Sequence, residues 1–191
     1  MNVLFIDACV RENSRTRELA EYVIAQLKDD SVSEVKVEHI MCGNVELPEM
    51  NESFINFRNR ASASGNFDSP VFDHARRFAS ADAVVIAAPF WDLSFPAILK
   101  RYLEHLCVPG VTFKYDAHGI PVSLCNAKRL IYVTTAGGPI FDDAFGFGYV
   151  KALAEGYFGI DDVRMLKAEN LDIDGADVEA ILDEAKAGFM L

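Results

Sequence analysis

Cysteine is scarce in this sequence, and the few cysteines are not paired. Cys9, Cys42, Cys107 and Cys125 lie far apart, and no two of them form a CxxC motif. This spacing indicates neither a zinc site nor the disulfide framework of a small secreted domain. We therefore expect free thiols, no bound metal and a cytoplasmic location.

Positive charge is also in short supply. The chain has 18 Lys and Arg against 29 Asp and Glu, a formal net charge of -11. Nucleic acids and anionic membranes are bound through lysine and arginine, so neither is an expected partner. No apolar run reaches the roughly 18 residues of a membrane span. The run from Val3 to Val10 contains Asp7 and has no basic start, so it does not resemble a signal peptide.

Two phosphate-binding motifs are missing as well. The sequence has neither the GxxxxGK[ST] of nucleotide-hydrolysing loops nor the GxGxxG of dinucleotide folds, and Gly146-Phe147-Gly148 does not complete the latter. No Ser-His-Asp or Cys-His arrangement is evident. We expect structural or solvated roles for the four histidines, which are His39, His74, His105 and His118.

What the sequence does contain is a regular alternation of apolar runs and amphipathic stripes. Its length fits one domain, residues 1–191. Apolar, β-branched runs predict buried strands, and apolar residues three or four positions apart predict helices. Strands are expected near residues 3–6, 35–40, 83–88, 129–134 and 163–166. Helices are expected to bury stripes within residues 19–27, 72–79, 99–106, 150–157 and 178–185.

These five βα units predict an α/β fold. Such an alternation gives a doubly wound parallel sheet with helices on both faces, and ligands bind at the carboxyl ends of its strands. In the first helix we expect Arg17 to face outward with the other charged residues. The acidic run from Asp172 to Glu179 has its glycine too early for a calcium loop, so we expect it to cap the last helix.

Two segments depart from this pattern. Residues 41–65 are polar, rich in Asn and Ser, and long for a connection, which makes them a candidate mobile flap. Residues 111–115, followed by the turn-forming Asp116-Ala117-His118-Gly119, predict a β-hairpin outside the main sheet.

Three loops after strands carry the candidate chemistry. The first leads through Ser14, Arg15 and Thr16 into a helix, whose unpaired N–H groups favour a phosphate, although the same hydroxyl groups would also serve as a simple cap. The second contains Phe90 and the only tryptophan, suited to stacking on a planar ring or to core packing. The third, residues 134–139, has paired glycines that suit either a tight turn or close approach of the backbone to a ligand.

Three stretches resemble the FMN-dependent azoreductase and NAD(P)H quinone reductase family of flavodoxin-like proteins. Residues 88–100 are similar to the family's A-P-[FM]-[WY]-N-[FL]-x-x-P/S-x-x-L-K. Residues 109–115 are similar to its G-V-T-F-[KR]-Y, and residues 135–138 to its S-x-G-G.

The resemblance implies a flavodoxin-like sheet of strand order 2-1-3-4-5 and an FMN cofactor. It also implies reduction of the FMN by NADH or NADPH, ping-pong transfer to quinone or azo acceptors, and a homodimer with the flavin near the interface. The resemblance further implies that no protein side chain acts as catalyst, because the flavin carries the reaction. The implied FMN-binding residues are Cys9, Ser14, Arg15, Thr16, Pro89, Phe90, Trp91, Asp92, Leu93, Thr135, Ala136, Gly137 and Gly138.

The sequence departs from the family at two of these positions. Asp92 stands where Asn is usual, and Ala8-Cys9 where a Ser is frequent. An ionised Asp92 would repel the reduced, anionic flavin and lower its reduction potential. Two alternatives remain open: a flavodoxin-type electron carrier, whose usual T-x-T-G-x-T loop is missing here, and a flavin-free hydrolase of the same fold.

Overall fold

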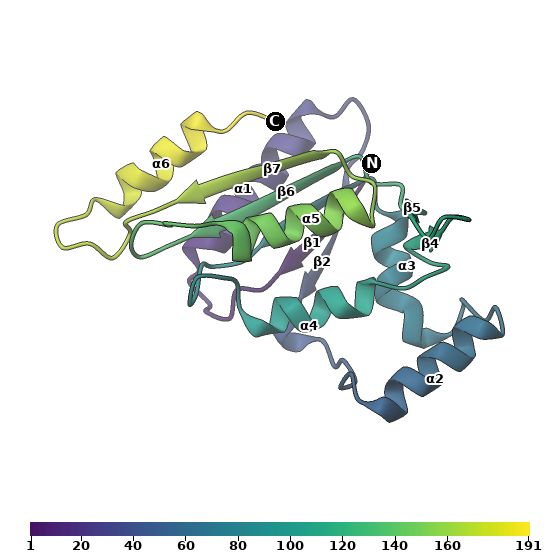
Figure 1. Cartoon of the computed structure of the whole chain (residues 1–191). Coiled ribbons are helices and arrows are strands. Elements are labelled where there is room, and N and C mark those ends of the chain that lie inside the picture. Colours follow the sequence, from purple (N-terminus) through teal and green to yellow (C-terminus); the bar gives the residue numbers. More distant parts are fainter.

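A computed structural model describes residues 1–191, and its middle layer is a five-stranded parallel sheet of order β2-β1-β3-β6-β7 (Figure 1). With the strands outside this sheet left out of the numbering, this is the predicted order 2-1-3-4-5, so the flavodoxin-like fold is confirmed. The strands are β1 (Asn2–Asp7), β2 (Lys36–Met41), β3 (Ala83–Ala87), β6 (Arg129–Thr135) and β7 (Asp162–Ala168).

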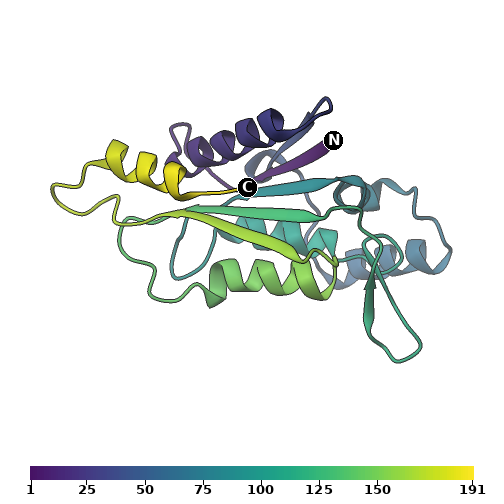
Figure 2. The same ribbon diagram turned by 90° about the horizontal axis from the view of Figure 1, so that it is seen from above.

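Helices cover both faces of the sheet (Figure 2). One face is covered by α1 (Arg15–Asp30) and α6 (Val178–Gly188). The other is covered by α3 (Asp73–Ser80), α4 (Ala97–Leu106) and α5 (Tyr149–Gly156), which a π-helical turn, Ala144–Gly148, precedes. None of the helices combines the length and the apolar character needed to cross a bilayer.

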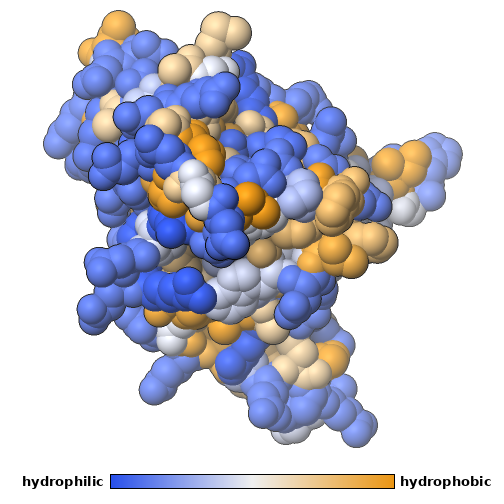
Figure 3. Space-filling view, turned by 90° about the vertical axis from the view of Figure 1, so that its left-hand side faces the viewer, coloured by the Kyte–Doolittle hydropathy of each residue, from blue (hydrophilic) through white to orange (hydrophobic).

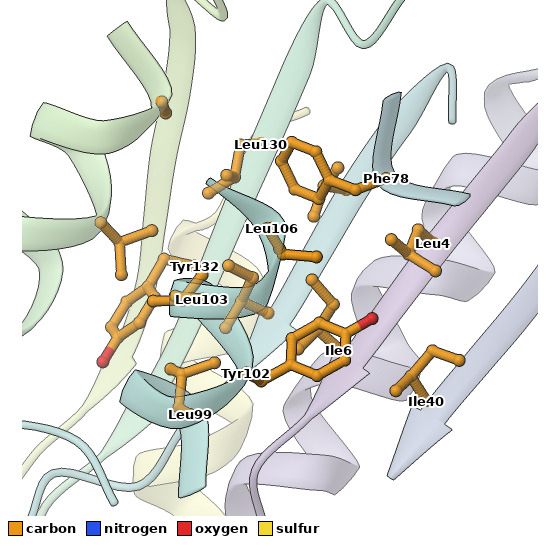
Figure 4. Close-up of a cluster of buried hydrophobic side chains, with 14 of the residues drawn as sticks. Leu4, Ile6, Ile40, Phe78, Leu99, Tyr102, Leu103, Leu106, Leu130 and Tyr132 are labelled. Carbon is orange, nitrogen blue, oxygen red and sulfur yellow. The ribbon is translucent and has the colours of Figure 1, made fainter. Parts of the chain in front are cut away.

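The core consists of two apolar layers separated by the sheet. Because side chains alternate along a strand, Leu4 and Ile6 of β1 face α3 and α4 (Figure 4), whereas Val3 and Phe5 face α1. Tyr102 of α4 is among the large side chains that the first of these layers buries completely. Strands buried on both faces explain the continuous apolar runs in the sequence.

The polar segment after β2 contains more regular structure than the sequence indicates. A 3₁₀ turn (Cys42–Asn44) is followed by α2 (Glu52–Ala63), whose first turn is capped by Asn51, and by a second 3₁₀ turn, Pro70–Phe72. The sequence pattern did not predict this helix, and the mobility of residues 41–65 stays a prediction. No residue of α2 is fully buried, so the segment lacks the apolar stripe by which a helix is recognised.

The predicted hairpin is present. Its strands, β4 (Phe113–Tyr115) and β5 (Pro121–Ser123), are antiparallel and extend away from the main sheet (Figure 2). Asp116 forms the turn by accepting hydrogen bonds from the amides of His118 and Ile120.

Candidate functional site

A cavity of about 290 Å³ opens where the loops after β1, β3, β6 and β7 meet. Figure 3 looks onto this side of the molecule, where small apolar patches lie among hydrophilic residues. All the predicted binding residues except Asp92, Leu93 and Gly138 line the cavity. The lining residues are Cys9, Val10, Arg11, Asn13, Ser14, Arg15, Thr16, Pro89, Phe90, Trp91, Thr135, Ala136, Gly137, Leu171 and Asp172.

The start of α1 presents a series of unpaired backbone donors. Ser14 is the N-cap residue, and its side-chain oxygen accepts a hydrogen bond from the amide of Arg17 at 3.3 Å. The amides of residues 10–16 donate to no protein acceptor. Together with the positive end of the helix dipole, such amides form an anion site. Ser14 therefore caps the helix with its oxygen, and its O–H group can still donate into the cavity.

Arg15 and Thr16 connect this loop to its neighbours. Arg15 Nη1 lies 2.8 Å from Asp172 Oδ1 and donates at 3.3 Å to the carbonyl of Leu171. The hydroxyl groups of Thr16 and Thr135 lie 2.6 Å apart in a buried hydrogen bond. The first turn of α1 is thus fixed to the ends of both β6 and β7.

Arg17 does not face outward, contrary to expectation. Its Nε lies 2.6 Å from Oδ2 of Asp7, a carboxylate whose side chain is fully buried at the end of β1. Its remaining nitrogens donate to the carbonyls of Cys9, Arg11 and Glu12. The helical pattern could not reveal this, because the buried partner lies on the preceding strand.

The aromatic loop after β3 is shaped by a two-residue turn. Trp91 and Ser94 exchange backbone hydrogen bonds of 2.9 and 2.8 Å, and the residues between them, Asp92 and Leu93, both have positive φ, of 50° and 66°. Such a turn suits Asn, Asp and Gly. The amide of Phe90 donates to the carbonyl of Thr135, which joins this loop to β6. Asp92 and Leu93 are exposed and hold Trp91 at the cavity instead of lining it.

The glycine loop packs closely against the loop after β7. The amide of Asp172 donates to the carbonyl of Gly137 at 2.9 Å. A Cβ atom on Gly137 would lie 2.4 Å from Asp172 Oδ2 and 3.1 Å from Asp172 Cβ, whereas one on Gly138 would meet nothing within 4 Å. Close approach of two loops therefore requires glycine at position 137 only.

The cavity is lined by no histidine, and its one carboxylate, that of Asp172, is paired with Arg15. Burial raises the pKa of the Cys9 thiol to about 12, so the thiol stays protonated at neutral pH. The histidines lie elsewhere: His39 contacts Asp7, His74 and His105 lie in a separate pocket beside α2, and His118 is in the hairpin turn.

Five of the residues that line the cavity were not predicted from the sequence. Val10, Arg11 and Asn13 belong to the first loop and could have been included with Ser14, since the whole loop precedes a helix. Asp172 is the first residue of the acidic run after β7, and Leu171 immediately precedes it. That run was interpreted as a cap for α6, and Asp177 does cap α6 by accepting a hydrogen bond from the amide of Ala180.

Known proteins are similar to this chain in both sequence and fold. The family profile described as flavodoxin-like fold matches residues 1–190. The chain is 35% identical over 191 residues to an FMN-dependent NADH:quinone oxidoreductase of Lachnoclostridium phytofermentans, covering 96% of this chain and 93% of that protein. It is 45% identical over 120 residues to FMN-dependent NADH:quinone oxidoreductase 2 of Clostridium acetobutylicum, which covers 60% of this chain and 59% of that protein.

A solved structure of an azoreductase is also similar to this chain. The azoreductase from Bacillus anthracis superposes with a TM-score of 0.82 at 26% sequence identity, covering 98% of this chain and 95% of that chain. The chain therefore belongs, as its motifs predicted, to the flavodoxin-like family of FMN-dependent NADH:quinone oxidoreductases and azoreductases.

Proposed function

We propose that this protein is an oxidoreductase that binds FMN and transfers electrons from NADH or NADPH to quinone or azo acceptors. One observation carries the proposal: a single cavity combines the unpaired amides at the start of α1 with the apolar residues Pro89, Phe90 and Trp91. A phosphate and a planar heteroaromatic ring are the two ends of FMN, and each matches one part of this lining.

The residues present fit FMN in the hydrogen-bond donors and apolar side chains that they offer. The backbone amides of residues 10–16 and the hydroxyl group of Ser14 would hold the phosphate. Arg15 would add positive charge beside the phosphate while it remains paired with Asp172. Pro89, Phe90 and Trp91 would back the ring. Residues 135–137 would meet its edge, where backbone amides stabilise the negative charge of the reduced ring.

FMN, when bound, would supply the redox chemistry that links the nicotinamide donor to the acceptor, in the ping-pong sequence that the resemblance implies. The chain's own residues would bind FMN, orient its ring and shield the ring from water. Apolar side chains from residues 89–91 would exclude water from one side of the ring, and the hydrogen bond from the amide of Phe90 to the carbonyl of Thr135 joins the aromatic loop to the glycine loop. No titrating side chain is needed, so water can supply protons to the acceptor.

We also propose a homodimer with the flavin near its interface. An apolar groove of about 490 Å³ lies between α4 and α5 and includes Phe95, Phe145 and Tyr149. Ser94, which closes the Trp91 turn, donates to the carbonyl of Phe145 at 2.6 Å, so the groove adjoins the aromatic loop. Phe145 is 62% exposed and the nearby Phe141 84% exposed, an apolar surface that a second subunit would bury. Sedimentation of the purified protein tests this.

A cytoplasmic location completes the proposal. All four cysteines are free thiols, as expected in a reducing compartment where NADH and NADPH are also available.

The decisive experiment is an absorption spectrum of the purified protein with added FMN, followed by NADH or NADPH under anaerobic conditions. Binding should perturb the flavin band, either nucleotide should bleach it, and a quinone should restore it. Reduction without turnover on soluble quinones would favour a flavodoxin-type carrier instead. A protein that binds no FMN would favour a hydrolase and contradict the proposed function.

A further inference from the structure

Arg17 acts as a clamp on the loop between β1 and α1. Its side chain is only 15% exposed, and it turns back from the first turn of α1 toward the end of β1. Nη1 donates to the carbonyls of Arg11 at 3.1 Å and Glu12 at 3.0 Å, and Nη2 donates to the carbonyl of Cys9 at 2.9 Å. One planar guanidinium therefore fixes three peptide groups of this loop.

Asp7 sets the orientation of this guanidinium. Its Oδ2 accepts from Arg17 Nε at 2.6 Å and lies 3.1 Å from Nε2 of His39, while Oδ1 accepts from the amide of Cys9 at 2.8 Å. The ring of His39 is itself stacked on Phe5 of β1. The carboxylate of Asp7 is thus contacted by a residue of the helix α1, by the loop that follows β1 and by the neighbouring strand β2.

The clamp determines where the loop's N–H groups point. In a planar trans peptide the C=O of one residue and the N–H of the next point in opposite directions, and the chain has no cis peptide. Because the carbonyls of Cys9, Arg11 and Glu12 point at Arg17, the amides of the residues that follow them point away from it. Two of those residues, Val10 and Asn13, line the cavity. Arg17 itself does not.

We propose that Arg17, oriented by Asp7, is the positioning residue that makes this cavity selective for a flavin carrying a terminal phosphate. It acts without touching the phosphate, by turning the loop's N–H groups toward the cavity. The inference rests on the proposed binding of FMN.

A comparison of FMN with riboflavin, which has the same ring and no phosphate, tests this role. Trp91 is the only tryptophan and lines the cavity, so quenching of its fluorescence reports binding of either flavin. Arg17→Lys keeps the charge but loses the planar fork, and Arg17→Met removes both. We expect each variant to bind FMN at least about tenfold more weakly, because hydrogen bonds to a charged phosphate become misaligned. Riboflavin binding should stay within about twofold of the wild-type value.

Two further variants sharpen the test. Asp7→Asn should shift the ratio of the two dissociation constants in the same direction, because it frees the guanidinium to reorient. Arg77→Met is the matched control: Arg77 pairs with Glu38 at 2.8 Å on the protein surface, away from the cavity, and its loss should leave the ratio unchanged.

Each outcome decides between roles. A selective loss of FMN binding in the Arg17 variants supports positioning. An equal loss of both flavins, including loss through unfolding, would assign Arg17 a structural role only and overturn the inference, as would an unchanged ratio in Arg17→Lys. A wild-type protein that binds both flavins equally would also overturn it. Failure of the wild-type protein to bind either flavin would refute the proposed function itself.

Discussion

Thr16 and Thr135 place their hydroxyl groups 2.6 Å apart, although they are far apart in the chain. Thr16 belongs to the first turn of α1 and Thr135 ends β6, and both are buried. This hydrogen bond joins the end of the candidate site that we propose binds phosphate to the loop that would meet the ring.

Thr135→Val is expected to destabilise the protein, because it leaves the Thr16 hydroxyl buried without a partner. The free energy of unfolding should fall by about 1–3 kcal/mol, measured by urea denaturation. Thr135→Ser keeps the hydroxyl group and should cost less. The double variant Thr16→Val/Thr135→Val should lose less than the sum of the single variants. Strict additivity would show that the two residues do not interact.

Gly137→Ala should destabilise the flavin-free protein by about 1–3 kcal/mol, the usual cost of overpacking. The added methyl group would collide with Asp172 and displace its carboxylate from Arg15. Gly138→Ala is the matched control in the same loop, since nothing lies within 4 Å of its Cβ position. Thermal unfolding followed by circular dichroism compares the two. Equal melting temperatures would contradict the close packing of these loops.

The fold and most of the site could be predicted because each depends on local patterns. The buried strand at residues 83–87 is apolar throughout, and Ser14 precedes a helix whose apolar stripe is regular. Both signals are contained within a few consecutive residues. The parallel topology then brings the loops after β1, β3 and β6 to one edge of the sheet.

What could not be predicted depends on contacts between distant segments. Asp172 reaches the cavity only because its amide bonds to Gly137, and Arg17 turns inward only because Asp7 is buried beside it. The helix α2 was not predicted because it makes few buried contacts. It buries no residue fully, so its sequence shows no apolar stripe.

Leu93→Asn should stabilise the protein. Leu93 has φ of 66°, a conformation that costs an ordinary L-residue about 1 kcal/mol and that Asn tolerates better, and its side chain is 55% exposed, so little packing is lost. We expect a gain of about 0.5–1 kcal/mol in the free energy of unfolding. A lower melting temperature in the variant would contradict a strained turn.

Asp92→Asn should make the bound flavin easier to reduce. The carboxylate lies in the turn next to Trp91, so removing its charge reduces repulsion of the anionic reduced flavin. Since Asp92 is exposed, solvent screens this charge, and we expect a rise in midpoint potential of only about 10–20 mV, or roughly 0.5–1 kcal/mol over two electrons. Spectroscopic redox titration at low and high salt tests this. The rise should shrink at high salt, and an unchanged potential at low salt would contradict it.

The buried ion pair predicts how stability depends on pH. Burial by itself would raise the pKa of Asp7, but hydrogen bonds from Arg17, the Cys9 amide and His39 outweigh it and hold the pKa below the usual value of 3.8. A carboxyl group with a lowered pKa in the folded state stabilises the protein above its unfolded-state pKa. That stabilisation is lost as the pH falls through the folded-state pKa.

Asp7→Asn abolishes this titration and leaves Arg17 without its partner, at an expected cost of about 3–5 kcal/mol at neutral pH. The difference in unfolding free energy between wild type and variant should be constant near neutrality. It should narrow below about pH 4, where the Asp7 carboxyl group of the unfolded chain begins to protonate while that of the folded protein is still ionised. Asp162→Asn is the control, because Asp162 pairs with Arg164 and Arg129 at a partly exposed site. This substitution should lower the free energy of unfolding by no more than about 1 kcal/mol.

Urea denaturation between pH 3 and pH 7 measures both differences. If the Asp7→Asn difference stays constant down to pH 3, folding does not lower the pKa of Asp7, which would contradict the prediction. If that difference is small at neutral pH, the Asp7–Arg17 pair does not stabilise the fold.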